Sequence, residues 1–361
     1  MKKIIIVCAS LIGFTAIAQK TDKTNIDYEL EMYPVELISK EKKVNVVVDY
    51  DYRSKSESAT QDIAAKKDQA AKDKAEFDKK NYGEKLLATK VMGEAKPTGY
   101  YTNSSFIPTL FPQEQVQAQI NIPGYAKAAD AKGTVNVMFS ELTYTIDATK
   151  TKLTYYPLTI TLSITNDKGV SVFQGTLPGN TGYTTFTATA VDMQKNELTY
   201  IKNAETSAKN TAVNNLNTYL KIGYGFNVVK KDRPFFDVKD KKQTYPECHE
   251  AIEKVKNAFV YVNMPAKQDV MIAKLKEAVA AWEKDLTELD KANKDARINK
   301  DVAAALYLNI AEASIWTKDF DKAYEALASH KALDEDYSRT YKDISEFLKD
   351  YSGRYNKYTQ Y

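Results

Sequence analysis

Residues 301–333 read DVAAALYLNIAEASIWTKDFDKAYEALASHKAL, a sequence that indicates two short amphipathic helices joined by a tight turn. Apolar residues recur at steps of three and four on each side of the turn, which is the spacing of one buried helix face. Small residues fall where the two helices have to approach each other. A single hairpin of this kind cannot bury its own apolar face, so we expect neighbouring helices to complete its core.

Seven packing positions of this hairpin have the spacing of a known repeat: Tyr307, Ile310, Ala311, Ser314, Phe320, Ala323 and Leu327. The pattern resembles the tetratricopeptide repeat, a helical hairpin of about 34 residues. Two departures are visible, since His330 stands where the family has alanine and no proline follows at residues 334–335. The resemblance implies a helical array that binds or scaffolds another protein.

The segments on both sides of the hairpin predict further amphipathic helices, which makes residues 244–361 an all-helical, tetratricopeptide-like domain. We expect one helix to begin at a capping box of Thr244 and Glu247, and the hairpin itself to begin at a cap on Asn299. A second helix covers residues 267–289. A final helix has a matching apolar stripe and would cap the array: Tyr337, Tyr341, Ile344, Leu348 and Tyr351.

Residues 19–229 predict a β-rich body with segregated helices, so the fold class expected for the whole chain is α+β. Apolar and polar residues alternate over residues 26–53, 116–122, 133–146, 154–164, 183–191 and 198–201, and Asn166 begins a hairpin turn that ends at Gly169. We expect an antiparallel sheet, sandwich or partial barrel. Residues 43–46 and 134–137 share Val-Asn-Val, which indicates either an internal duplication or two strands of one sheet.

Two helices interrupt the strands of the body. Residues 54–80 have a thin apolar stripe of Ile63, Ala70 and Phe77, which favours a surface helix on the sheet over a coiled-coil contact with a partner. Residues 204–222 have a broader apolar face. In the proline-rich stretch between the helices we expect Phe106, Leu110 and Phe111 to pack onto the body. Residues 230–243 are basic and aromatic and are interpreted as a connector, with binding to an acidic surface as the alternative.

Residues 1–18 have the three parts of a secretory signal: Lys2 and Lys3, an apolar run, and a small-x-small site that predicts cleavage between Ala18 and Gln19. The apolar run is shorter than the roughly 20 residues of a membrane span, and no later stretch is long enough. We therefore expect export to the periplasm, the cell envelope or the outside of the cell. The amino-acid composition of the chain is rich in Lys, Tyr and Asn and poor in His and Cys, and in this it resembles exported Bacteroidota proteins.

Most catalytic and metal-binding constellations lack the residues they need in this sequence. The chain has two histidines and two cysteines, and Cys248 is the one cysteine left after cleavage. Adjacent Cys248 and His249 would diverge by about 100° on a helix, so they do not form a zinc site by themselves. His330 is expected to be a packing or surface residue. No phosphate loop or Gly-x-Ser-x-Gly motif is present. We expect neither cofactor nor metal.

The expected function is that of a non-enzymatic, exported protein that binds or scaffolds another protein through its helical end. A nearly balanced net charge of +3 argues against a general nucleic-acid binder. The first alternative is carbohydrate binding by a face of the body rich in tyrosine, of which the chain has 25. The second is a hydrolase with a pair of carboxylates. The partner and the oligomeric state remain open.

Overall fold

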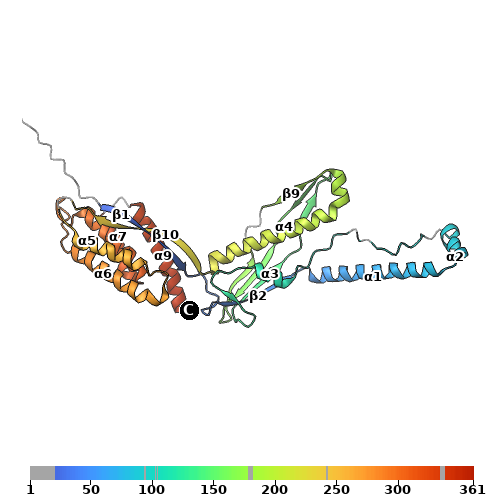
Figure 1. Cartoon of the computed structure of the whole chain (residues 1–361), viewed down its shortest axis with the longest axis horizontal. Coiled ribbons are helices and arrows are strands. Elements are labelled where there is room, and N and C mark those ends of the chain that lie inside the picture. Colours follow the sequence, from blue (N-terminus) through green and yellow to red (C-terminus); the bar gives the residue numbers. More distant parts are fainter. Residues whose placement is uncertain are drawn as a thin grey trace, which may run out of the picture. The chain divides into compact units, whose positions relative to one another are not determined.

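A computed structural model describes residues 21–92, 95–101, 103, 105–177, 182–240, 243–333 and 338–361. The predicted signal, with Ala18 and Gln19, lies outside these residues, as does Tyr337. The chain divides into two compact units. Of the described residues, the helical unit comprises 21–33 together with 228–360, and the sheet unit comprises 34–227. The α+β class is the predicted one (Figure 1).

The sheet unit contains a five-stranded sheet in the order β3-β2-β4-β7-β8. Its strands are β2 (Lys43–Tyr50), β3 (Ala126–Lys127), β4 (Thr134–Phe139), β7 (Ile160–Thr165) and β8 (Ser171–Thr176). Strand β2 is parallel to β3 and β4, whereas β4, β7 and β8 are antiparallel. The predicted all-antiparallel sheet is therefore corrected to a mixed one, because residues 51–133 make a long crossover between β2 and β4. The two Val-Asn-Val strands are neighbours in this sheet.

A second, antiparallel sheet contains β5 (Tyr144–Ile146), β6 (Lys152–Tyr155) and β9 (Thr184–Thr187). The long helix α4 (Ala190–Tyr224) covers the core of this unit with a buried stripe of small and aliphatic residues. Its alanines at steps of four, Ala204, Ala208 and Ala212, are fully buried and allow close approach. The hairpin turn predicted between Asn166 and Gly169 is confirmed.

Two predicted strands of the sheet unit are wrong, and the single strand predicted over residues 154–164 is divided between β6 and β7, which lie in different sheets. Residues 198–201 belong to α4, and the alternating stretch 116–122 is largely helix α3 (Gln113–Gln119). Val116 and Ile120 are both buried, and their spacing of four residues fits a helix as well as a strand. Short apolar stretches carry this ambiguity, and tertiary packing decides it. The predicted packing of Phe106, Leu110 and Phe111 against the core is confirmed.

Helix α1 (Arg53–Lys79) is followed by α2 (Tyr82–Leu86) and the π-helical turn η1 (Leu87–Val91). Only Ser56 and Phe77 of its 27 residues are buried. The first turn contacts the rest of the unit, where Lys55 pairs with Glu141 at 2.7 Å. The prediction that this helix lies on the sheet is thus wrong beyond its first turns, because the thin stripe offers too little apolar area to hold it there (Figure 1).

The helical unit includes a two-stranded sheet of β1 (Thr21–Met32) and β10 (Asn227–Val238). This division differs from the expected boundaries, since residues 21–33 lie with the helices and most of the expected connector 230–243 is a strand. Tyr28, Leu30 and Phe235 of this sheet are buried in the helical core. The two strands are about 200 residues apart, so no local pattern indicates that they pair.

Five long helices complete this unit: α5 (Pro246–Phe259), α6 (Gln268–Leu286), α7 (Lys300–Trp316), α8 (Phe320–Leu333) and α9 (Arg339–Gln360), with the turn η2 (Pro265–Lys267) before α6. Helix α5 packs on α6, α6 on α7, and α7 on both α8 and α9. The predicted cap on Asn299 is confirmed, whereas the helix after Thr244 has no side-chain cap. Within the described residues, no helix has the length and apolar character that crossing a bilayer requires.

Candidate functional site

A surface hollow of about 340 Å³ lies over the central helix α7, between α6 and α8. The residues that line it are Glu283, Leu286 and Thr287 from α6 and its end, Tyr307 and Ile310 from α7, and Lys322, Glu325, Ala326 and Ser329 from α8. Its size is at the lower end of the range for ligand pockets and suits a few side chains of a peptide. The helical unit therefore presents a shallow groove.

The apolar lining of the hollow comes from residues that the repeat pattern indicated. Ile310 is 3% exposed and Tyr307 is half-buried, so the groove receives their accessible edges while most of each side chain packs between helices. Leu286 and Ala326 add apolar surface from the flanking helices. An apolar lining with a few placed polar groups is the usual composition of a binding pocket.

Charged residues lie along the rim of the hollow. The ammonium of Lys322 on α8 contacts a carboxylate oxygen of Glu283 on α6 at 2.8 Å, and this ion pair spans the groove. It raises the pKa of Lys322, with a hydrogen bond to Glu283 as the largest cause. Glu325 adds a second carboxylate. Since both signs of charge are present, the rim can bind a peptide of mixed charge or a helix with complementary ion pairs.

The other five predicted packing positions lie away from the groove. Ala311, Ser314, Ala323 and Leu327 are buried in the packed hairpin of α7 and α8. Phe320 instead packs against Tyr351 and Tyr355 of α9, with ring centroids 6.3 and 5.5 Å apart. These five residues pack within the helical unit, whereas Tyr307 and Ile310 also line the hollow.

Behind the groove, α7 carries buried polar residues that connect it to β10 and α9. Arg233 of β10 lies 3.7 Å from the carboxylate of Glu312, and it donates a hydrogen bond to the carbonyl oxygen of Asp343. The indole of Trp316 donates to Glu312 at 3.2 Å. Sequence reasoning missed this cluster, although an acid inside the apolar run IAEASIW was a visible signal.

Asn309 makes a second connection between α7 and β10. Its side-chain oxygen accepts from the backbone nitrogen of Phe236 at 2.7 Å, and its amide nitrogen donates to the carbonyl of the same residue at 2.8 Å. Asn309 therefore pairs with the strand as a neighbouring strand would. This pairing satisfies backbone groups that are costly to bury unpaired.

Cys248 and His249 point to different partners, as their adjacency predicted. The buried thiol of Cys248 donates to Asp285 at 2.9 Å, and burial raises its pKa well above the usual range, so it is an unreactive thiol. Asp285 also forms an ion pair with Arg297, with the two atoms 2.6 Å apart. His249 lies 2.8 Å from Asp237. Among the described residues, no group of three or more His, Cys, Asp and Glu side chains could hold a metal ion.

His330 is a packing residue, which is one of the two roles expected for it. It is 2% exposed, its Nδ1 lies 2.9 Å from the carbonyl oxygen of Ala304, and its ring stacks on Tyr341. The side chain of His330 thus pairs with the backbone of α7. A histidine at this position is compatible with a packed hairpin.

Lys318 occupies the turn between α7 and α8. Its backbone φ is 62°, a left-handed conformation that few residues adopt. Its ammonium lies over the rings of Tyr351 and Tyr355, at 4.2 and 5.4 Å from their centroids, and contacts the hydroxyl of Tyr351. Burial lowers the pKa of Lys318 to about 8. The partly desolvated amine of Lys318 therefore packs the turn against Tyr351 and Tyr355 of α9.

A larger hollow of about 580 Å³ lies in the sheet unit, between the start of α1, residues 107–110 and Lys202 of α4. The buried carboxylate of Glu205 accepts from the backbone nitrogen of Thr109 at 2.7 Å, and burial raises its pKa. Tyr52 and Ser56 donate to the carbonyls of Thr109 and Pro108. These contacts hold the 107–110 segment in place. Of the residues that line this hollow, Glu57 is the one acid.

Many tyrosines of the sheet unit are core residues, among them Tyr50, Tyr52 and Tyr155. Tyr156 and Tyr183 are exposed and pack edge to face, with centroids 6.2 Å apart.

Comparison with known proteins adds no relative, because neither a protein-family model nor a curated protein matches the chain. The candidate site therefore depends on its own geometry.

Proposed function

We propose that this protein is a non-enzymatic scaffold that binds a segment of another protein in the groove over α7. The observation that carries the proposal is that residues of the repeat pattern also line the surface hollow. Tyr307 and Ile310, which the repeat pattern indicated, also line the hollow between α6 and α8. An apolar floor with charged edges suits the docking of an amphipathic segment.

The rigid surroundings of α7 support this proposal. Helix α7 buries 13 of its 17 residues, and Glu312 and Asn309 connect it to strand β10. A floor held in this way loses little conformational entropy when a ligand binds, and preorganisation of this kind increases affinity. The proposed setting is the periplasm or cell envelope, which rests on the signal-like residues 1–18.

A photocrosslinking amino acid in place of Ser329 tests the proposal in the full chain, in the cell that naturally produces it. Ser329 lines the hollow, whereas its neighbour Ala328 is exposed and does not line it, so the same probe at Ala328 is the matched control. We expect a discrete protein adduct at position 329 that is absent at 328. Equal adducts at both positions, or none at 329, would contradict the proposal.

Carbohydrate binding remains the second candidate, and the exposed pair of Tyr156 and Tyr183 favours it. Aromatic rings with an accessible face can pack on sugar rings, and this pair lies outside the core. A glycan array with the wild-type chain and the Tyr156→Ala variant separates the two functions. Saturable binding that the variant loses would support the sugar site. The crosslinking result at Ser329 does not depend on this outcome.

A further inference from the structure

Four large apolar side chains are exposed within eleven residues just beyond α1. Tyr82, Leu86, Leu87 and Met92 are 82, 46, 52 and 65% exposed, and we call them the tip patch. Single exposed apolar residues are ordinary on a protein surface, but a group of this size indicates a binding surface. The patch comprises residues of α2, η1 and the residue that follows them.

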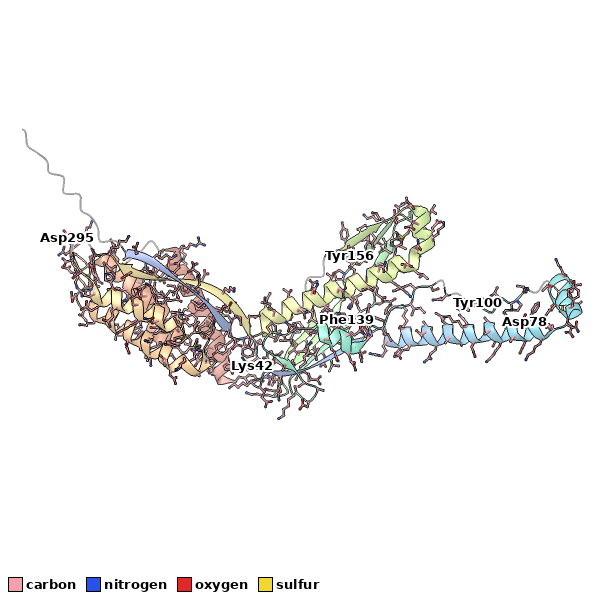
Figure 2. The ribbon with its side chains drawn as sticks, in the orientation of Figure 1. Lys42, Asp78, Tyr100, Phe139, Tyr156 and Asp295 are labelled. Carbon is pink, nitrogen blue, oxygen red and sulfur yellow. The ribbon has the colours of Figure 1, made fainter. Side chains whose placement is uncertain are left out.

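The segment that carries the tip patch is well defined locally. Asn81 forms a capping box with Glu84, in which each side chain accepts a hydrogen bond from the other residue's backbone nitrogen. Ala88, which follows the two exposed leucines, is buried. Gly99 and Tyr101 of the returning segment lie against Lys74 and Lys66 of α1. Figure 2 labels their neighbour Tyr100 alongside this helix. The apolar side chains are therefore held on the outside of a folded turn.

Positive charge surrounds the tip patch. Residues 79–92 contain four lysines and one glutamate, a net charge of +3, and the exposed Asp78 precedes them. Lys79, Lys80 and Lys90 are exposed. Lysines beside exposed leucine and tyrosine side chains are typical of segments that lie in the interface of an anionic membrane. Tyrosine in particular prefers the headgroup region of a bilayer.

We propose that the tip patch binds the surface of an anionic lipid bilayer, with Leu86 and Leu87 entering the headgroup boundary and the surrounding lysines contacting lipid phosphates. Charge complementarity favours this occupant over a protein helix. A helical partner would need the apolar stripe of α1, but its largest member, Phe77, is 7% exposed and already covered. The contact is peripheral, and it is independent of the groove over α7.

Tryptophan fluorescence tests the proposal on residues 19–361, the chain expected after cleavage, because the basic and apolar residues 1–18 would themselves bind anionic vesicles. Both native tryptophans, Trp282 and Trp316, are buried, so a Leu87→Trp variant places a distinguishable reporter in the tip patch. We expect its emission to shift to shorter wavelength with vesicles that contain about 30 mol% phosphatidylglycerol, and to be quenched by brominated lipid. Val260 is 63% exposed in the helical unit, so Val260→Trp is the matched control and should not respond.

Vesicle sedimentation supplies the second measurement. We expect binding to be about tenfold weaker for neutral phosphatidylcholine vesicles and to weaken further at about 0.5 M salt, because anionic headgroups and low screening both favour the lysines. The double variant Leu86→Ser, Leu87→Ser should lose about tenfold in binding, whereas Val260→Ser should not. Circular dichroism of each variant confirms that it is folded.

Three results would overturn the proposal. Absence of binding to anionic vesicles removes it outright. Equal binding by the wild-type chain and the Leu86→Ser, Leu87→Ser variant places the lipid contact elsewhere. A response of Val260→Trp as strong as that of Leu87→Trp shows adsorption without a specific surface.

Discussion

Helices α7 and α1 show two ways in which one chain stabilises a helix. Helix α7 buries 13 of 17 residues and packs against α6, α8 and α9, whereas α1 buries two of 27. Their sequences differ accordingly. Helix α7 is mostly Ala, Leu and Ile, while α1 is mostly Lys, Ala and Asp. Tertiary packing stabilises the first helix, and residue propensities with local pairs stabilise the second.

Local interactions along α1 supply the support that packing provides to α7. Lys72 pairs with Asp68 at 3.1 Å, and Lys74 pairs with Asp78 at 2.7 Å. Exposed pairs of this kind stabilise a helix only slightly, by about 0.3–0.5 kcal/mol each. Damage to α1 should therefore stay local, whereas damage to α7 should unfold the helical unit. The following predictions test this contrast.

A proline in each helix should give the largest difference. Ala313→Pro breaks α7 in its buried interior, which costs about 3 kcal/mol for the helix and more for the lost packing, so we expect the helical unit to unfold. Ala70→Pro in α1 should lower helicity without shifting the main unfolding transition. Circular dichroism and urea titration measure both. A shift of the main transition by Ala70→Pro would show that α1 supports the fold.

Removal of the buried carboxylate on α7 should have the next largest effect. Glu312→Ala leaves the guanidinium of Arg233, which is 5% exposed, without its ionic partner, and breaking a buried ion pair costs about 3–5 kcal/mol. Urea unfolding measures the loss. Glu76→Ala on α1 is the matched control and should change stability by less than about 0.5 kcal/mol.

A double variant separates the ion pair from simple loss of packing. With Arg233→Met and Glu312→Leu together, no buried charge is left alone, so we expect most of the stability to return. A double variant as unstable as Glu312→Ala would mean that shape, and not charge, explains the single variant.

The contrast between the two helices also explains which parts of the fold sequence reasoning could predict. Periodicity predicted α6 to α9 and the Asn299 cap, because each depends on residues that are near in sequence. It could not predict that β1 pairs with β10, because that pairing joins strands about 200 residues apart. It also assigned residues 116–122 to a strand, since Val116 and Ile120 suit either period.

The candidate groove was predictable only in part, for a similar reason. The repeat pattern indicated Tyr307 and Ile310, whose roles depend on their own hairpin. Glu283 and Leu286 come from α6, and their place beside α8 depends on how one hairpin packs on the next. The opposite holds for the tip patch, where Leu86 and Leu87 were visible in the sequence but their exposure was not.

Lys318 at the end of α7 should give a smaller effect that depends on pH. Burial lowers its pKa to about 8 in the folded chain, below an ordinary value near 10.5, so the folded state favours the neutral amine. The unfolded state binds more protons between these values, and stability from this residue therefore rises as pH increases from about 8 towards 10.5. Below pH 8 this contribution is absent.

The variant Lys318→Met isolates this contribution, because methionine meets the same left-handed backbone but does not titrate. The wild-type chain should gain up to about 3 kcal/mol relative to the variant between pH 7 and pH 10.5. Urea titrations of both proteins at several pH values measure the difference, and the other titrating groups cancel. If the difference in unfolding free energy between the wild-type chain and the variant stays constant with pH, the amine of Lys318 is solvated and its pKa is not lowered.

The smallest effect is expected at the capping box of α2, and it should be local. Asn81→Ala removes the side-chain oxygen that accepts from the backbone nitrogen of Glu84 at 3.0 Å, which costs about 1 kcal/mol of local helix stability. Hydrogen exchange at residues 84–86 should accelerate about fivefold, since local opening governs exchange there. The urea midpoint should not change, because α1 and α2 add little to the packed core. Asn299→Ala is the corresponding change at α7, and because that cap is buried and α7 is central, it should shift the midpoint of the helical unit. Equal global effects of the two caps would contradict the contrast between a helix that depends on its surroundings and one that depends on its own sequence.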